Sequence, residues 1–338
     1  MTELVGTKPV RTSRRGRTSP VKDWLEQWRT EAGIGTGLVA VCIAWSFAAP
    51  NFLTGTNLRL ALMQASVLML IALGETIALL TGEIDLAIGS MAGLSSVVFA
   101  DLAVRHGVPF GLAIIAVLAM GAVSGLLIGA LRVVWNIPSF ITTLGLLSAY
   151  QGLSLVISRG TSIAPVPAAF AQAWSGTLVG IPVPIVIAVV ITGLAAAVLA
   201  FTPFGRHLYA VGGNARVARR HGIRVSVVRT AVFMVSEILG VCAGLLVAAE
   251  LSAGDSTVGY GYELLGIAGA VVGGVSLFGG AGSVIGAVIG VLFIEAIQDG
   301  LTLIGVSTNV FLIAEGALVV FAVWWASLQR RRRTDEVG

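Results

Sequence analysis

Residues Thr202–Thr230 read TPFGRHLYAVGGNARVARRHGIRVSVVRT and form the one long polar stretch between hydrophobic segments of the chain. This stretch is rich in arginine and contains no acidic residue. Asn214 is a favourable N-cap residue, and Gly222 is a favourable residue just beyond a helix C-terminus. The interval between them predicts about two turns of helix, over Ala215–His221. We expect a short basic helix held at a membrane surface between two spans; an ordinary positively charged cytoplasmic loop is the alternative.

The remainder of the chain is strongly hydrophobic. Of its 338 residues, 56% are hydrophobic and 11% are charged, whereas soluble domains carry about 25% charged residues. This composition predicts an all-α integral membrane protein whose transmembrane domain covers residues 32–328 and contains about ten helices of ~20 residues each. The expected spans are 33–52, 58–80, 88–104, 108–133, 139–158, 181–201, 227–250, 263–278, 281–298 and 308–328.

Basic residues indicate how these spans are oriented. With an even number of spans, all but three of the 21 Lys and Arg residues (Arg59, Arg105 and Arg159) lie on one side. The positive-inside rule makes that side the cytoplasm, so we expect both termini and the loop 202–229 to be cytoplasmic. Residues 1–31 would form a basic tail with an interfacial helix or a solvated linker, and 329–338 a basic end. The net charge of +4 therefore needs no nucleic-acid partner.

Three motifs occur in a specific order along the chain: TGEIDLAIGS at 81–90, GRHLYAVGGN at 205–214, and GYEL at 261–264 followed by GGVSLFGG at 273–280. In the order and the residues of these motifs, the chain resembles bacterial ABC-importer permeases for ribose and related sugars. The matching pieces run from about residue 55 to about residue 325. In that family, the loop corresponding to 202–229 holds the coupling helix, which docks into a groove on the ATPase subunit.

The resemblance implies the membrane-spanning permease subunit of an ATP-driven carbohydrate importer in the bacterial inner membrane. It implies a pore formed as a homo- or heterodimer, a separate cytoplasmic ATP-binding subunit and an extracytoplasmic sugar-binding protein. The chain would itself be no enzyme, and it contains no GxxxxGK[ST] phosphate-binding motif, so nucleotide would bind elsewhere. Neither a cofactor, a catalytic group nor a metal site is expected. The residues implied in coupling are Gly213, Asn214, Ala218, Arg219, Arg220 and Gly222.

Two glycine-rich breaks interrupt the expected spans, at Gly82–Gly89 and Gly274–Gly280. Irregular backbone persists in a bilayer only where it is buried in protein or lines a water-filled cavity. Repeated broken helices are typical of transporters, although glycine also serves ordinary helix packing. The glycines of interest are Gly82, Gly89, Gly274 and Gly279. Glu83 and Ala87 replace the Gly and Ser of the family motif TGGIDLSVGS, and we expect Glu83 to reach cytoplasmic water.

Carboxylates inside the expected spans point to a transport route. Glu75, Glu237, Glu295 and Glu315 have no basic residue at their depth, and a charge there costs about 2.5–3.5 kcal/mol. Each is therefore protonated, hydrogen-bonded to a neighbouring helix, or facing water. Because sugar hydroxyls need scattered donors and acceptors, the candidate pathway residues are Gln64, Glu75, Phe140, Thr143, Gln298 and Asp299. The alternatives are a proton-coupled secondary transporter that uses the carboxylates as relays, and a membrane scaffold.

Overall fold

The computed structural model describes residues 20–307, together with a few helical positions between 310 and 324. The described chain is mainly helical, as its composition predicts, and its two short strands, β1 and β2, form a hairpin in which Thr177 pairs with Pro182. The elements are α1 (Pro20–Ala48), α2 (Gly55–Leu80), α3 (Ile88–Ala100), the π-helix η1 (Asp101–Arg105), α4 (Phe110–Val134), α5 (Ser139–Ser158), α6 (Ala168–Ser175), β1 (Thr177–Leu178), β2 (Ile181–Pro182), α7 (Val183–Phe201), α8 (Pro203–Arg220), α9 (Val225–Glu250), α10 (Tyr262–Val272) and α11 (Val284–Leu303).

Within the described residues, eight segments are long and apolar enough to cross a membrane. They belong to α1, α2, α3 with η1, α4, α5, α7, α9 and α11, and they agree with eight of the ten expected spans. The expected span 263–278 is not one continuous helix, because α10 ends at Val272 after 11 residues. At 1.5 Å per residue this helix is about half as long as the ~30 Å hydrocarbon core. The tenth expected span, 308–328 with Glu315, lies largely outside the described residues.

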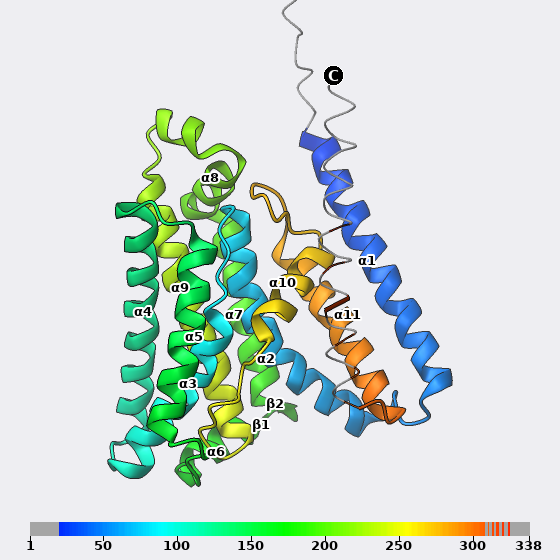
Figure 1. The fold of residues 1–338 in the computed structure, drawn as a ribbon. Coiled ribbons are helices and arrows are strands. Elements are labelled where there is room, and N and C mark those ends of the chain that lie inside the picture. Colours follow the sequence, from blue (N-terminus) through cyan, green and yellow to red (C-terminus); the bar gives the residue numbers. More distant parts are fainter. Residues whose placement is uncertain are drawn as a thin grey trace, which may run out of the picture.

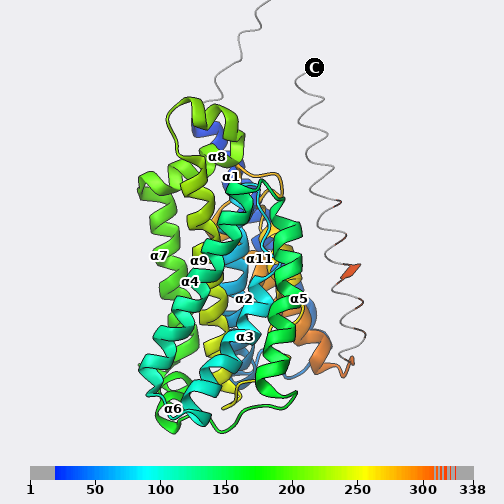
Figure 2. The same ribbon diagram turned by 60° about the vertical axis from the view of Figure 1, so that its left-hand side comes forward.

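Helix α9 lies at the centre of the bundle and packs against α2, α3 and α4 (Figures 1 and 2). Its contact with α4 is close because Gly121, Gly125 and Gly129 repeat every fourth residue and face it. A Cβ atom added at Gly125 would lie 2.4 Å from the Cα of Met234 on α9. Small residues at this spacing bring helix backbones together in membranes, where dispersion rather than the hydrophobic effect stabilises packing. The α4–α9 pair is therefore closely packed.

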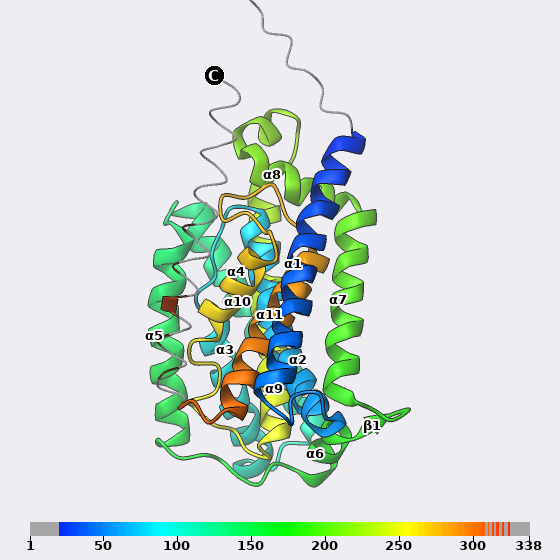
Figure 3. The ribbon, with the colours of Figure 1, turned by 90° about the vertical axis from the view of Figure 1, so that its right-hand side faces the viewer.

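Helix α1 stands at the side of the bundle and packs along α11 (Figures 1 and 3). It is one continuous helix from Pro20, so the segment in which we expected an interfacial helix is the beginning of α1. The Ser283 hydroxyl, at the start of α11, donates a 2.5 Å hydrogen bond to Glu31. The beginning of α1 and all of α8 lie at one end of the bundle, while α6 and the β-hairpin lie at the other (Figures 1 and 3).

At the end of the bundle opposite α8, hydrogen bonds tie the loops around α6 together. Ile163 and Gly254 exchange backbone hydrogen bonds of 2.8 and 3.0 Å, which ties the loop before α6 to the loop after α9. Beside them, Asp255 accepts hydrogen bonds from the Ser162 hydroxyl (2.5 Å) and from the backbone N–H and hydroxyl of Thr257 (2.8 and 2.7 Å). These donors favour the carboxylate and hold the pKa of Asp255 below its ordinary value.

Candidate functional site

Helix α8 consists of two helical segments joined at Asn214. This residue has φ −163° and ψ 98°, which is extended backbone. Its side-chain Oδ1 accepts from the backbone N–H groups of Arg216 (3.1 Å) and Val217 (3.0 Å), which is the geometry of an N-cap. The second segment ends at Arg220, and Gly222 follows with φ +83°. The short capped helix expected from the sequence is therefore present at its expected place.

The two faces of α8 differ in chemistry. Gly205, Leu208, Val211 and Ala218 are buried against the rest of the chain. The exposed face carries most of the basic side chains, namely Arg206, His207, Arg216, Arg219, Arg220 and His221. Because Ala218 is only 5% exposed, it fixes the second segment to its own chain, whereas Arg219 and Arg220 point to the surroundings. Residues Gly213 and Asn214 are also exposed.

The first segment of α8 rests directly on both glycine-rich breaks. A Cβ atom added at Gly212 would lie 1.9 Å from the Leu80 carbonyl oxygen and 2.5 Å from the Gly280 backbone nitrogen. The Gly280 N–H donates to that same Leu80 oxygen at 2.9 Å, so the two breaks are joined to each other beneath α8. The Tyr209 hydroxyl adds a 3.0 Å hydrogen bond to the Gly282 carbonyl, and burial raises the pKa of this phenol. Backbone contact of this closeness is possible only with glycine at position 212.

The structure places all four singled-out glycines at or beside these breaks. The first break, residues 81–87, joins α2 to α3, and the second, residues 273–283, joins α10 to α11. Gly82, Gly274 and Gly279 have φ values of +74°, +87° and +87°, a backbone conformation that favours glycine. Gly89 lies in the first turn of α3, where an added Cβ would lie 2.1 Å from the Glu263 carboxylate at the start of α10. The breaks are thus packed against protein, as irregular backbone in a membrane requires.

Glu83 is buried, contrary to our expectation that it reaches water. It is 2% exposed and lies between two arginines from other helices. The Arg132 Nε, near the end of α4, donates to both Glu83 oxygens at 3.0 and 2.9 Å. The Arg229 Nε, near the start of α9, lies 2.8 Å from Glu83 Oε1. The sequence signal that was missed is the common depth of these three residues, because Arg132 and Arg229 stand at the span ends nearest to the first break.

A cluster of carboxyl groups lies deeper in the bundle. Glu75 of α2, Asp85 of the first break and Glu237 of α9 are each 0% exposed, and Asp85 is adjacent to both glutamates. Glu237 Oε2 accepts from the Ser124 hydroxyl at 2.9 Å, and Ser124 is 2.5 Å from the Tyr150 hydroxyl. This chain crosses from α5 through α4 to α9, so Glu237 is hydrogen-bonded to a neighbouring helix, one of the outcomes expected for buried carboxylates.

The six candidate pathway residues do not gather at one place. Glu75 is buried in the chain's own core, while Gln64 and Phe140 are exposed on α2 and α5. The Thr143 hydroxyl lies 3.0 Å from the Ser139 carbonyl and 3.4 Å from that of Ile84 in the first break. Gln298 and Asp299 lie toward the far end of α11, where Asp299 accepts a 2.6 Å hydrogen bond from Asn57. Within the single chain these residues lie apart, and their place on a transport route stays a prediction.

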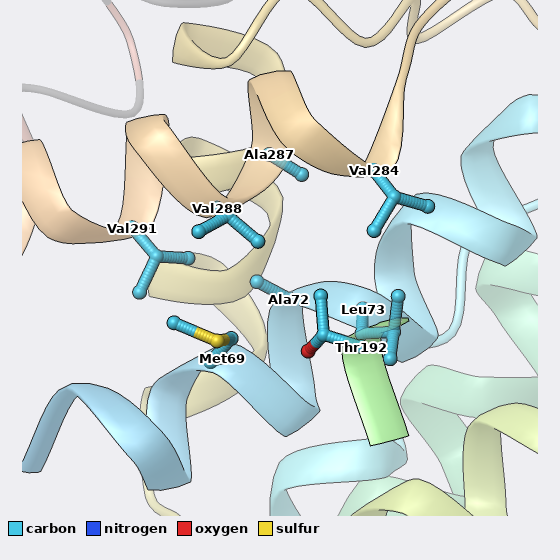
Figure 4. Close-up of a pocket in the computed structure, with 8 residues that line it drawn as sticks. All are labelled: Met69, Ala72, Leu73, Thr192, Val284, Ala287, Val288 and Val291. Carbon is cyan, nitrogen blue, oxygen red and sulfur yellow. The ribbon is translucent and has the colours of Figure 1, made fainter. Parts of the chain in front are cut away.

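A small pocket lies between α2, α7 and α11 (Figure 4). The Thr192 hydroxyl of α7 is the oxygen atom in a lining that is otherwise apolar (Figure 4), and it has no hydrogen-bond partner among the described residues. A sugar needs several polar partners, so the lining does not suit one. The lining residues are Met69, Ala72, Leu73, Thr192, Val284, Ala287, Val288 and Val291.

Comparison with known proteins identifies the family of this chain. Residues 57–323 match the family described as "Branched-chain amino acid transport system / permease component". The chain belongs to this permease family. With its eight candidate spans, it is a multi-pass protein of the inner membrane. No solved structure matches it.

Three relatives of this chain are named as permeases for sugars. The ribose import permease protein RbsC of Bacillus subtilis is 37% identical over 289 residues, covering 85% of this chain and 89% of the relative. The D-allose transport system permease protein AlsC of Escherichia coli is 34% identical over 285 residues, covering 84% and 87%. The L-arabinose permease protein AraH of Azospirillum brasilense is 32% identical over 331 residues, covering 94% and 96%.

Proposed function

We propose that this permease forms, as a dimer, the translocation pore of an ATP-driven monosaccharide importer, and that α8 is its contact with a separate ATPase. The observation that carries the proposal is the construction of α8. An Asn-capped helix presents Arg219 and Arg220 outward, while the segment before it rests on both chain breaks through Gly212. A partner that moved the exposed face would therefore move the breaks as well.

The position of α8 supports this assignment. The positive-inside rule puts this basic end of the bundle in the cytoplasm, where ATP is available. Movement of α8 would tilt α7 and α9, the spans on either side of it in the chain. Alternating access would then be a shift between two arrangements of the spans, biased by ATP binding to the partner. An extracytoplasmic binding protein would deliver the sugar to the opposite end.

The substrate class rests on the relatives rather than on the family's description. That description names branched-chain amino acids, whereas the named relatives act on ribose, D-allose and L-arabinose. Their alignments cover more than four-fifths of both chains, so we infer a monosaccharide. Uptake of labelled ribose, D-allose and L-arabinose by cells with and without the gene tests this, with leucine as the comparison; gene-dependent uptake of leucine alone would contradict it.

A pull-down in mild detergent tests the coupling role. The tagged wild-type chain should recover an ATPase subunit, identified by mass spectrometry. The Arg219→Glu/Arg220→Glu variant should lose it, because two exposed cations of the contact are inverted. Arg159→Glu, a charge inversion at the opposite end of the bundle, is the matched control and should retain the ATPase. A chain recovered without an ATPase, with uptake that a protonophore abolishes, would instead establish a proton-coupled secondary transporter. Native mass spectrometry of the same preparation tests the dimer.

A further inference from the structure

The charge cluster around Glu83 joins three parts of the fold. Glu83 belongs to the first break, Arg132 to the last turn of α4, and Arg229 to the second turn of α9. The cluster is largely buried, with side-chain exposures of 2% for Glu83, 18% for Arg132 and 20% for Arg229. A buried carboxylate is stable only with partners. One carboxylate therefore holds together two cations that would otherwise repel each other.

The two arginines hold Glu83 in different ways. The single Nε–H of Arg132 is shared between both carboxylate oxygens, and its Nη1 donates to the Asn136 side chain at 3.1 Å. Arg229 is equally close at 2.8 Å, yet its Nε does not form a hydrogen bond of normal geometry. Arg132 is thus fixed by direction and charge, whereas charge alone holds Arg229. A contact of the second kind is the easier one to open and re-form.

The break at Glu83 is anchored to α2, α4 and α5, and α9 reaches it through Arg229 beside Glu83 and through Ser236 and Glu237 beside Asp85. The Glu83 backbone N–H donates to the Ala78 carbonyl at 3.1 Å, and the Ile84 N–H donates to the Ser139 hydroxyl at 3.2 Å. These bonds fix the break to α2 and α5, and Arg132 fixes it to α4. Arg229 reaches it from α9, and four residues separate α9 from the end of α8. Arg219 of α8 also acts electrostatically on Arg229, as a like charge.

The geometry assigns Glu83 and Arg229 as positioning residues that carry movement of α8 to the first chain break. This inference rests on the proposed function and goes beyond it, because it names a second link besides the glycine contact at Gly212. When α8 moves, α9 moves with it, and Arg229 pulls on or releases Glu83. Arg132 stays bound and keeps the carboxylate partnered throughout.

The test uses the whole permease with its ATPase, reconstituted in liposomes. The transport per ATP hydrolysed is measured with labelled ribose, D-allose or L-arabinose, whichever the cells take up. Arg229→Gln should lower this ratio at least about fivefold, within the range of known coupling effects, while ATPase binding persists. Arg229→Lys should keep the wild-type ratio, because a contact held by charge does not need the guanidinium fork.

Arg132 supplies the matched comparison. Arg132→Lys should lower the thermal unfolding midpoint of the permease, because the guanidinium binds Glu83 through Nε and Asn136 through Nη1 and a single ammonium does not span both, whereas Arg229→Lys should not. If Arg229→Gln does not fold, Glu83→Asp is tested in its place. The aspartate side chain is one methylene shorter, so its carboxylate lies farther from Arg229. A folded Glu83→Asp variant should therefore transport less sugar per ATP hydrolysed. A wild-type ratio in Arg229→Gln, or in a folded Glu83→Asp, overturns the inference alone. A wild-type chain that binds no ATPase overturns the proposed function instead.

Discussion

The backbone N–H of Gly280 donates a 2.9 Å hydrogen bond to the carbonyl oxygen of Leu80, which joins two breaks that are far apart in the sequence. Gly212 of α8 lies directly over this bond. Three stretches of glycine-rich backbone therefore meet at one point, with no side chain between them. Any displacement of α8 must be followed by the two breaks or must open this contact.

Substitution of Gly212 by Ala should destabilise the permease. The added methyl group would lie 1.9 Å from the Leu80 oxygen, so backbone must move, and overpacking of this kind costs about 1–3 kcal/mol. The free energy of unfolding in detergent measures the effect. Gly213→Ala is the matched control, because nothing lies within 4 Å of its added Cβ. Equal stability of the two alanine variants would show that the contact is not tight.

The sequence predicts the helices of this fold better than it predicts their partners. Hydrophobic length alone locates α2, α4, α5, α7 and α9 to within a few residues, and Asn214 with Gly222 locates the second segment of α8. Span 263–278 was overestimated because apolar residues continue past Val272, although the glycines after it end the helix. Composition does not distinguish apolar break residues from apolar helix residues.

The partners of Glu83 could not be predicted for a different reason. The positive-inside rule places Arg132 and Arg229 among the basic residues of the cytoplasmic side. Water alone can solvate an arginine there, so the sequence gives no reason to expect a buried partner. Their inward orientation depends on how α4 and α9 are rotated, and that rotation is set by the glycine contacts of Gly121, Gly125 and Gly129 with α9. Ion pairs between residues as far apart in the sequence as Glu83 and Arg229 depend on how the helices pack, and a single sequence does not reveal that packing.

Removal of the Asn214 cap should loosen the second segment of α8. In Asn214→Ala, the N–H groups of Arg216 and Val217 lose their acceptor, which costs about 0.5–2 kcal/mol. Hydrogen exchange of the backbone amides in residues 215–220 should quicken accordingly, while exchange in α9 stays unchanged. Asn214→Asp retains an acceptor oxygen and should exchange as the wild type does. Faster exchange in both variants would contradict the capping role.

Loss of the Ser124 hydroxyl should weaken the packing of α4 on α9. Ser124→Ala leaves Glu237 Oε2 without its 2.9 Å donor, and hydrogen bonds between membrane helices are worth about 0.6 kcal/mol on average and at most about 1.7. Tyr150→Phe removes the neighbouring hydroxyl but leaves that donor in place, so it should cost less. Unfolding in mixed micelles compares the two. A larger loss in Tyr150→Phe would mean that Tyr150, rather than Ser124, supports Glu237.

Acid should weaken the loop contact at the end opposite α8 through Asp255. The folded-state pKa of this carboxyl is depressed by its bonds from Ser162 and Thr257, so the carboxylate contributes stability above its unfolded pKa of about 3.9. That contribution is lost as the pH falls from about 4 through the lower folded pKa. In Asp255→Asn this contribution is absent at every pH. The difference in unfolding midpoint between wild type and variant should therefore be constant from pH 7 to about pH 5 and should shrink below about pH 4. Because other carboxyl groups titrate equally in both proteins, only the difference reports Asp255, and a difference that stays constant down to pH 3 would exclude a depressed pKa.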